Sequence, residues 1–408
     1  MRADPARHAR HPAWSLARGV YLPRSADGAA SAMATYGIPL TVVATTGSAA
    51  LTGLAFTLEW LPRLGAFTVA GTVVDRYGFA RVFRTACALR ALSVAVAAFL
   101  MAVPGTGVAA VVTVMTLAPL TGFLSEFSYV AAETAGGGAS RTARARAHRV
   151  QSVLLGIDQT AMLAAPLGAG LLLEHGGPAI MLSALAAFSL LAAALAPGGP
   201  TAPGEAARGK GGLRTGWRTL RALPALVWLI GGLIVSNTAV ALLQAAVPVI
   251  VIRELGRSSA QAGLIWSAAA LVSLLAITVA RRAIDRWGLW PVGAIAATIA
   301  AGATLAVAHT HTYSGYLVLI AVLMAGEGGL TVVLRTLRSH LIPPDVFAST
   351  LAVTILLLLL PYPAAGLLVA ALPAASLGHA ITIAALLQAL GLATAFARLR
   401  TLAEVSTT

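Results

Sequence analysis

Ionisable side chains within long apolar stretches are the residues of this chain best suited to chemistry. They are Asp27, Glu59, Arg63, Arg90, Glu126, Asp158 and Glu327. A charge in a membrane-like interior costs several kcal/mol unless it is paired, neutralised or hydrated. Residues placed there are therefore candidates to carry protons, to bind a polar solute or to hold helices together.

Spacing and depth predict two ion pairs among these residues. Glu59 and Arg63 are four positions apart, so on a helix they share a face and can neutralise each other. Asp27 and Arg90 enter the apolar region at comparable depth from the same side, which predicts a pair between two helices. For both pairs, a structural role and a functional role are equally open.

Glu126, Asp158 and Glu327 have no obvious partner within one helical turn. An apolar environment favours the neutral form of a carboxyl, so such a group can take up a proton on one side and release it on the other. Glu327 is the best placed, because the glycines in the run 325–329 thin the helix and could admit water or substrate. The alternative is a buried acid satisfied by a neighbouring helix.

Two uncharged polar residues complete the candidate cavity. Asn237 and Gln244 are seven positions apart and share one helix face. They could donate hydrogen bonds to a substrate, although bonding between helices is equally common.

The composition places these residues in a membrane protein. Of 408 residues, 58% are hydrophobic and only 10% are charged, with a mean hydropathy of +0.85, which excludes an ordinary soluble domain. A spanning helix needs about 20 mainly apolar residues. The sequence predicts twelve, at 18–43, 49–74, 82–103, 108–133, 149–173, 178–196, 223–251, 258–281, 291–308, 314–338, 346–372 and 376–397.

A Pro/Gly-rich and then basic stretch at 197–222 divides these helices six and six, and the halves repeat. Landmark residues recur with matching spacing: Pro39, Gly47, Gly53, Asp75, Arg76 and Gly78 in the first half correspond to Pro248, Gly256, Gly263, Asp285, Arg286 and Gly288 in the second. Repeated halves are common in transporters, where they rock about a site near the bilayer midplane. We expect an all-α integral membrane protein of two pseudo-symmetric six-helix halves.

The net charge of +14 indicates orientation rather than nucleic-acid binding. Most basic residues gather at alternate helix ends, so the positive-inside rule predicts cytoplasmic termini and a cytoplasmic linker. The expected organisation is an N-terminal tail at 1–17, bundles at 18–196 and 223–397 separated by the linker at 197–222, and a C-terminal tail at 398–408.

The loop after the second predicted helix carries a recognisable motif. Its residues are Gly71, Asp75, Arg76, Gly78, Arg81 and Arg84, and a shorter second copy is Asp285, Arg286 and Gly288. This resembles the loop signature of the major facilitator superfamily, with Phe79 and Ala80 in place of the usual basic pair. The resemblance implies the major facilitator fold and a gating role for these residues, and Gly71 is expected at a close helix contact.

The chain also resembles one branch of this superfamily, the enterobactin exporter and the macrolide-efflux proteins. The resemblance rests on the runs 25–28, 46–49 and 216–218 together with Pro39. Pro166 and Gly170 are similar to an exporter motif in which glycines stand at two further positions. Small residues at a helix contact are the other explanation of that pattern.

These features predict a proton-coupled exporter of a small amphipathic organic compound such as a drug or siderophore, working by alternating access. The first alternative is proton-coupled uptake of a sugar, peptide or nucleoside. The second is a membrane protein that does not transport and serves as a sensor or partner. We expect no enzymatic activity, no cofactor and no metal. The expected partners are the substrate, protons and lipid, and the expected form is a monomer in the bacterial plasma membrane.

Overall fold

The computed structural model describes residues 16–103, 107–143, 147–196, 213–343 and 346–405. Within them nearly every residue is helical and no strand occurs. Most of the predicted tail at 1–17 and of the predicted linker at 197–222 lies outside the described residues.

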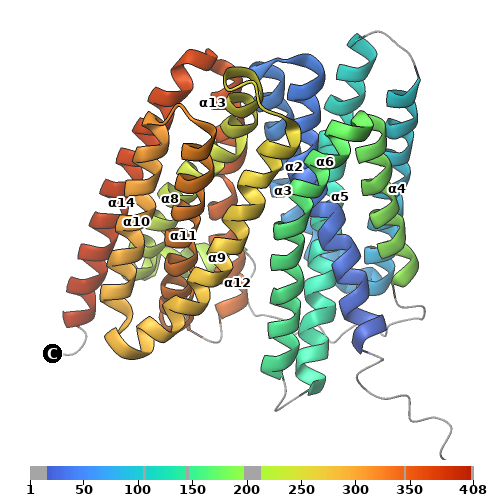
Figure 1. The fold of residues 1–408 in the computed structure, drawn as a ribbon. Coiled ribbons are helices and arrows are strands. Elements are labelled where there is room, and N and C mark those ends of the chain that lie inside the picture. The colour runs from blue at the N-terminus through green and yellow to red at the C-terminus, as the bar shows by residue number, and fades with distance from the viewer. Residues whose placement is uncertain (1–15, 104–106, 144–146, 197–212, 344–345, 406–408) are drawn as a thin grey trace, which may run out of the picture.

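The N-terminal half consists of five helices. After a π-turn at Ala17–Tyr21 (η2) come α2 (Leu22–Thr46), α3 (Ala49–Tyr77), α4 (Phe79–Ala102), α5 (Gly107–Ala143) and α6 (Ala147–Leu195). Gly177 has a φ of 70° inside α6, so α6 turns back there and crosses the molecule twice. The half therefore contributes six spans (Figure 1).

The C-terminal half begins with the short helix α7 (Leu213–Ala222). Its spans are α8 (Pro224–Val249, continued by η4 at Ile250–Glu254), α9 (Ser259–Trp287), α10 (Leu289–His309), α11 (Tyr313–Leu341), the pair α12 (Phe347–Leu359) and α13 (Pro361–Ala371), and, after η6 (Ala374–Ser376), α14 (Leu377–Val405). The single helix predicted at 346–372 is wrong in this detail. Pro361 and Pro363 lack the amide hydrogens that a continuous helix needs, so the span breaks at Leu360.

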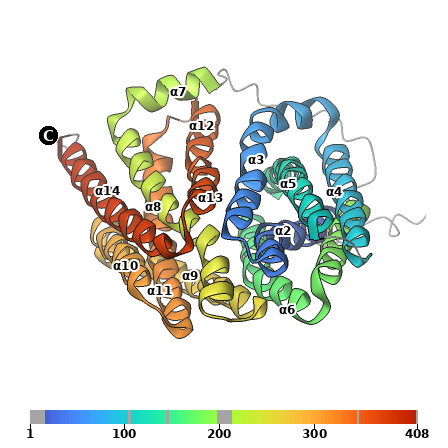
Figure 2. The same ribbon diagram turned by 90° about the horizontal axis from the view of Figure 1, so that it is seen from above.

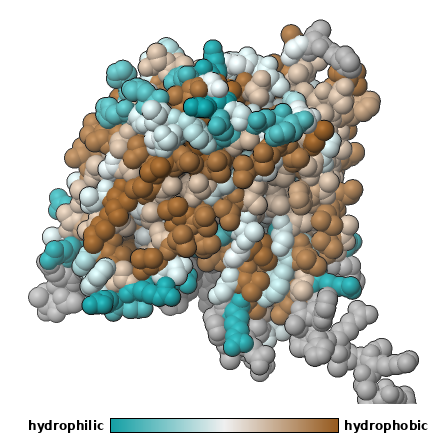
Figure 3. All heavy atoms as spheres, in the orientation of Figure 1, coloured by the Kyte–Doolittle hydropathy of each residue, from teal (hydrophilic) through white to brown (hydrophobic). Residues whose placement is uncertain are grey.

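Length and apolar composition mark nine segments of the described chain as able to cross a membrane. The segment within α6 supplies two crossings, and α2 and α3, which carry buried charges, complete the twelve spans. Figure 3 shows a hydrophobic band around the middle of the visible face, between hydrophilic rims at the top and bottom. An all-α protein of twelve transmembrane helices is therefore confirmed.

The sequence repeat corresponds to repeated turns. Gly78 and Gly288, which end α3 and α9, both have a φ of 83°. Gly47 and Gly256 have φ values of 61° and 60°. Only glycine adopts such angles at little cost, so equivalent glycines turn the chain at equivalent places in the two bundles seen side by side in Figure 2.

The two faces of the molecule differ in how closely the halves approach. We call the face at which α2 begins and α14 ends the terminal face, and the other the opposite face (Figure 1). At the opposite face α3 packs against α13, and α6 packs against α9. Backbone contact is so close that a Cβ atom on Gly53 would lie 2.5 Å from the Gly366 carbonyl oxygen.

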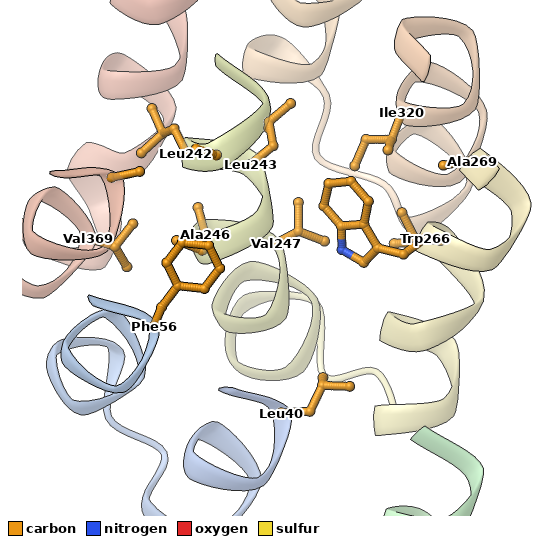
Figure 4. Close-up of a cluster of buried hydrophobic side chains, with 14 of the residues drawn as sticks. Leu40, Phe56, Leu242, Leu243, Ala246, Val247, Trp266, Ala269, Ile320 and Val369 are labelled. Carbon is orange, nitrogen blue, oxygen red and sulfur yellow. The ribbon is translucent and has the colours of Figure 1, made fainter. Parts of the chain in front are cut away.

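An apolar core seals this contact. In Figure 4, Leu40 and Phe56 of the N-terminal half face Ala246 and Val247 of α8, with Val369 beside them. Since these side chains are almost fully buried, the halves are closed to water at the opposite face.

Candidate transport site

The N-terminal half buries an ion pair among serines. The Arg90 guanidinium, fully buried, donates to Asp27 Oδ1 at 2.6 Å and so forms the predicted pair. Hydroxyl groups accept its remaining hydrogens at distances of 2.9 to 3.4 Å from Ser189, Ser31, Ser125 and Ser128. We call these six residues the Arg90 cluster. They join α2, α4, α5 and the second arm of α6 around a balanced charge.

Asp158 has no partner within its own helical turn, but it has a charged partner on another helix, which is the alternative that the sequence analysis left open. Arg24, which is 4% exposed, donates to both oxygens of Asp158 at 2.9 and 2.7 Å. It also donates to Glu133 at 2.5 Å. Arg24 is one of the basic residues near helix ends from which the sequence predicts the orientation of the chain. Its burial makes it part of an ionic link between α2, α5 and α6.

Glu59 and Arg63 form the predicted pair at 2.6 Å within α3. Arg63 also donates to Thr35 at 2.9 Å, and its guanidinium lies 4.4 Å from the centre of the Trp60 ring. Glu59 Oε2 and Arg63 Nε are buried without a hydrogen-bond partner in the described structure. Glu126 is 8% exposed.

Glu327 lies in a cluster of neutral groups in the C-terminal half. Ser236 donates to Glu327 Oε1 at 2.5 Å, and Gln388 donates to the same oxygen at 2.9 Å. Gln388 also donates to Ser236 at 3.0 Å and accepts from Thr304 at 2.7 Å. We call these four residues, from α8, α10, α11 and α14, the Glu327 cluster. Within the described chain, no ion pair involves Glu327 and no hydrogen bond is found to its Oε2.

Aromatic rings connect the halves between these clusters. The ring centres of Trp60 on α3 and Tyr362 on α13 are 4.1 Å apart, and the rings are stacked. Gln244 donates to the hydroxyl of Tyr36 at 3.4 Å, so it also crosses between the halves.

Asn237 and Gln244 do not act as a pair. Asn237 donates to the carbonyl oxygen of Leu358 at 2.9 Å, directly before the break between α12 and α13. Asn237 therefore links α8 to the end of α12, and Asn237 and Gln244 make separate contacts although they were predicted to share a helix face.

A cleft opens between the halves toward the terminal face. It has a volume of about 420 Å³ and lies among α6, α9 and α11. Its polar lining comes from Gln159, Arg281, Asp285, Thr331 and Arg335, together with Thr336. We call it the α6/α9/α11 cleft. With the opposite face sealed, it gives water and solutes a way into the space between the halves.

The residues of the loop motif lie at the terminal face. Gly78 and Gly288 make the turns, Arg84 donates to the Ala196 carbonyl oxygen at 2.9 Å, and Arg81 lines a separate apolar groove. Asp75, Arg76 and Arg286 are exposed. The expectation of a close helix contact at Gly71 is wrong, because a Cβ atom there would meet nothing within 4 Å.

Pro166 and Gly170 lie where α6 crosses α9 at the opposite face. A Cβ atom on Gly170 would overlap the Ser259 carbonyl, and one on Gly263 would overlap the Pro166 carbonyl. The pattern of small residues therefore serves a close crossing of helices from different halves.

The sequence analysis missed Arg24, Ser236, Thr304, Gln388 and Tyr362. Only Arg24 and Gln388 gave a signal, as a charged and an amide side chain beside or within an apolar stretch. Serine, threonine and tyrosine are too common in membrane helices to be singled out.

Comparison with known proteins agrees with this architecture. A family model described as Major Facilitator Superfamily matches residues 25–362. A bacterial homologue of the iron transporter ferroportin, in an inward-facing state, is similar in structure with a TM-score of 0.66 and 16% identity over 92% of this chain and 97% of that one. No curated protein sequence matches the chain.

Two further solved structures are similar. A mutant of the nucleoside transporter NupG has a TM-score of 0.66 and 11% identity over 93% of this chain and 99% of that one. A bacterial homologue of the human lysosomal transporter Spinster, inward-facing and unoccupied, has a TM-score of 0.65 and 13% identity over 93% and 97%. Such low identities establish the fold alone. The family model, however, covers most of the chain and both copies of the loop motif, so the protein belongs to the Major Facilitator Superfamily.

Proposed function

We propose that the protein is a proton-coupled exporter of a small amphipathic organic compound, of the kind the enterobactin-exporter and macrolide-efflux branch handles. Its halves would rock about the space between the Glu327 cluster and the aromatic residues Trp60 and Tyr362. Membership of a transporter superfamily supports secondary transport. Direction, coupling and substrate are the parts that this proposal adds.

The hydrogen bonding of Glu327 is the observation that carries the coupling. Both of its recorded bonds end on Oε1, and the donors, Ser236 and Gln388, are neutral. Oε2 can therefore gain or lose a proton without breaking either bond. Asp27, by contrast, is held in an ion pair with Arg90.

The distribution of arginines supports a cytoplasmic terminal face in the bacterial plasma membrane. Helix α7 carries Arg214, Arg218 and Arg221, and the ends of α3 and α9 carry Arg76 and Arg286. Positive charges are concentrated on the cytoplasmic side of membrane proteins. With that orientation, the sealed opposite face and the α6/α9/α11 cleft correspond to an inward-facing state of a monomer.

The proposed cycle assigns roles to the remaining candidates. Glu327 releases its proton into the cleft, the substrate binds, and the exposed motif residues Asp75 and Asp285 help to close the terminal face as the opposite face opens. Glu126, which forms no ion pair within the described residues, is the second candidate to carry a proton. The ionic link of Asp158 favours a structural or gating role for it.

Proton-coupled uptake is the second candidate function, and the basic lining of the cleft favours it. A bound anion and a proton on Glu327 would stabilise each other, since the proton removes a nearby negative charge. In cotransport, binding of the proton and binding of the substrate favour each other. In exchange, the proton and the substrate must instead compete for binding.

Cellular accumulation of a panel of fluorescent drugs and siderophore-like compounds tests the proposal. Cells would carry the natural protein, Glu327→Gln, or the matched control Glu254→Gln at an exposed site on the opposite face. We expect depletion that is lost in Glu327→Gln and with an uncoupler but kept in the control. Accumulation sensitive to the uncoupler would replace export by uptake, and transport unaffected by the uncoupler would refute proton coupling.

A further inference from the structure

The α6/α9/α11 cleft contains two cations that no neighbour neutralises. Arg281 and Arg335 both line it, and in the part of the chain that the structure describes neither forms an ion pair within 4.0 Å. Asp285 is the one acid of the described lining, so the positive charges exceed the negative. A cleft lined by an excess of positive charge attracts anions.

Arg281 and Arg335 lie farther from the ends of their helices than Arg286 and Arg338 on the same two helices. Arg281 is six residues before the end of α9 at Trp287, and Arg335 is six residues before the end of α11 at Leu341. At the helical rise this is about 9 Å into the bundle. All three of Arg281, Arg282 and Arg335 are exposed, but Arg282 is not part of the described cleft lining.

The cleft leads toward the Glu327 cluster. Glu327, Thr331 and Arg335 are spaced by four along α11, so they follow one another on one face of that helix. Ile277, Arg281 and Asp285 have the same spacing on α9. A solute held at the arginines would therefore lie about two helical turns from the carboxyl that is proposed to carry the proton.

Size and lining also fit a small organic ligand. Pockets for such ligands have volumes of about 300–1,000 Å³ and combine apolar walls with a few polar groups. Here Leu155, Ile277 and Val332 supply apolar surface, and Gln159 and Thr331 supply hydrogen-bonding groups beside the arginines.

We propose that Arg281 and Arg335 bind the anionic group, a carboxylate or phosphate, of the transported molecule in this cleft. Guanidinium groups suit both anions because their planar N–H donors can form two parallel hydrogen bonds. This inference rests on the proposed function in one respect, that the cleft is the path of the substrate. It holds for export and for uptake.

Thiol labelling tests the site without transport. Thr331→Cys places a reporter in the cleft, and the sole native cysteine, Cys87, is buried. Its labelling rate with an anionic methanethiosulfonate (the sulfonatoethyl reagent) is divided by its rate with a cationic one (the trimethylammonium reagent). Replacing both arginines, as Arg281→Gln with Arg335→Gln, should lower this ratio at least about tenfold, because two positive charges are lost near the reporter.

Matched variants separate charge from misfolding. Arg282→Gln, outside the lining, should leave the ratio unchanged, and Arg281→Lys with Arg335→Lys should keep it because both charges remain. If the ratio is the same with and without the arginines, the anion site is refuted, whatever the transport assay in cells shows. A ratio that follows the arginines stands even where proton-coupled export fails.

Protection identifies the source of the anion. In nanodiscs of phosphatidylcholine, benzoate and phenyl phosphate should slow labelling of Thr331→Cys, whereas benzyl alcohol and benzylamine should not. Protection that appears only when phosphatidylglycerol is added, and never with the soluble anions, would assign the arginines to a lipid headgroup and overturn the substrate site.

Discussion

Each half of the molecule contains a buried polar cluster that is built from equivalent helices of the repeat. The Arg90 cluster joins the first, third, fourth and sixth spans of the N-terminal half, and the Glu327 cluster joins the same four spans of the C-terminal half. The chemistry differs. Asp27 has a cation beside it, whereas Glu327 has only neutral donors.

This difference suggests a division of labour between the halves. In the Arg90 cluster the charges cancel, so adding a proton to Asp27 would leave Arg90 buried and uncompensated. In the Glu327 cluster a proton can come or go while both hydrogen bonds to Oε1 persist. The same four spans thus hold a fixed ion pair in the N-terminal half and a carboxyl that can change its charge in the C-terminal half.

The largest expected effect is on stability, from Arg90→Met. The substitution leaves Asp27 buried without its partner, which should lower the free energy of unfolding by about 3–5 kcal/mol. Thermal unfolding of the purified protein in detergent measures it. The double variant Asp27→Asn with Arg90→Met should recover most of the loss. Equal unfolding temperatures for Arg90→Met and the natural protein would show that the ion pair of the Arg90 cluster does not stabilise the fold.

Giving the Glu327 cluster a cation should make it resemble the Arg90 cluster. Gln388→Lys places an ammonium group beside Glu327, in reach of the oxygen that Gln388 now contacts at 2.9 Å. A neighbouring positive charge favours the ionised carboxyl, so the pH of half-maximal transport in proteoliposomes should fall by about 1–3 units. Gln388→Met controls for the loss of the amide. An unchanged pH midpoint would mean that Glu327 does not limit coupling.

The sequence predicted the helices well because their determinants are local. Apolar runs and the glycines at 47, 78, 256 and 288 place the spans and turns close to where the structure has them. Glu59 with Arg63 could be predicted from spacing alone, and Asp27 with Arg90 from depth.

Partners on distant helices could not be predicted in this way. Arg24 contacts Asp158 across 134 positions, and Gln388 contacts Glu327 across 61. Such pairs depend on how helices rotate and cross, which hydropathy does not encode. Asn237 shows the same limit, because it contacts Leu358 across 121 positions.

Removing the neutral donor Gln388 should have the opposite effect on Glu327 to adding a cation. Gln388→Leu deletes a hydrogen bond to the Glu327 carboxyl, and bonds to charged groups contribute about 1.5–3 kcal/mol. Because one pH unit corresponds to about 1.4 kcal/mol, the pH midpoint of transport should rise by about one unit. Thr304→Val, which touches Gln388 but not Glu327, should shift it less. A downward shift in Gln388→Leu would contradict the assigned donor role.

The smallest effect is expected at the most redundant contact of the Arg90 cluster. Arg90 Nη1 has three serine acceptors, and Ser128 is the farthest of them at 3.4 Å. Ser128→Ala leaves the other two in place, so it should change the free energy of unfolding by about 0.5 kcal/mol.

Ser189→Ala removes the acceptor of Nε and should cost about 1–2 kcal/mol, since that buried donor loses its bond. Thermal unfolding of both variants in detergent compares them. If Ser128→Ala is as costly as Ser189→Ala, the serines act as one packed unit rather than as separate acceptors around a fixed charge.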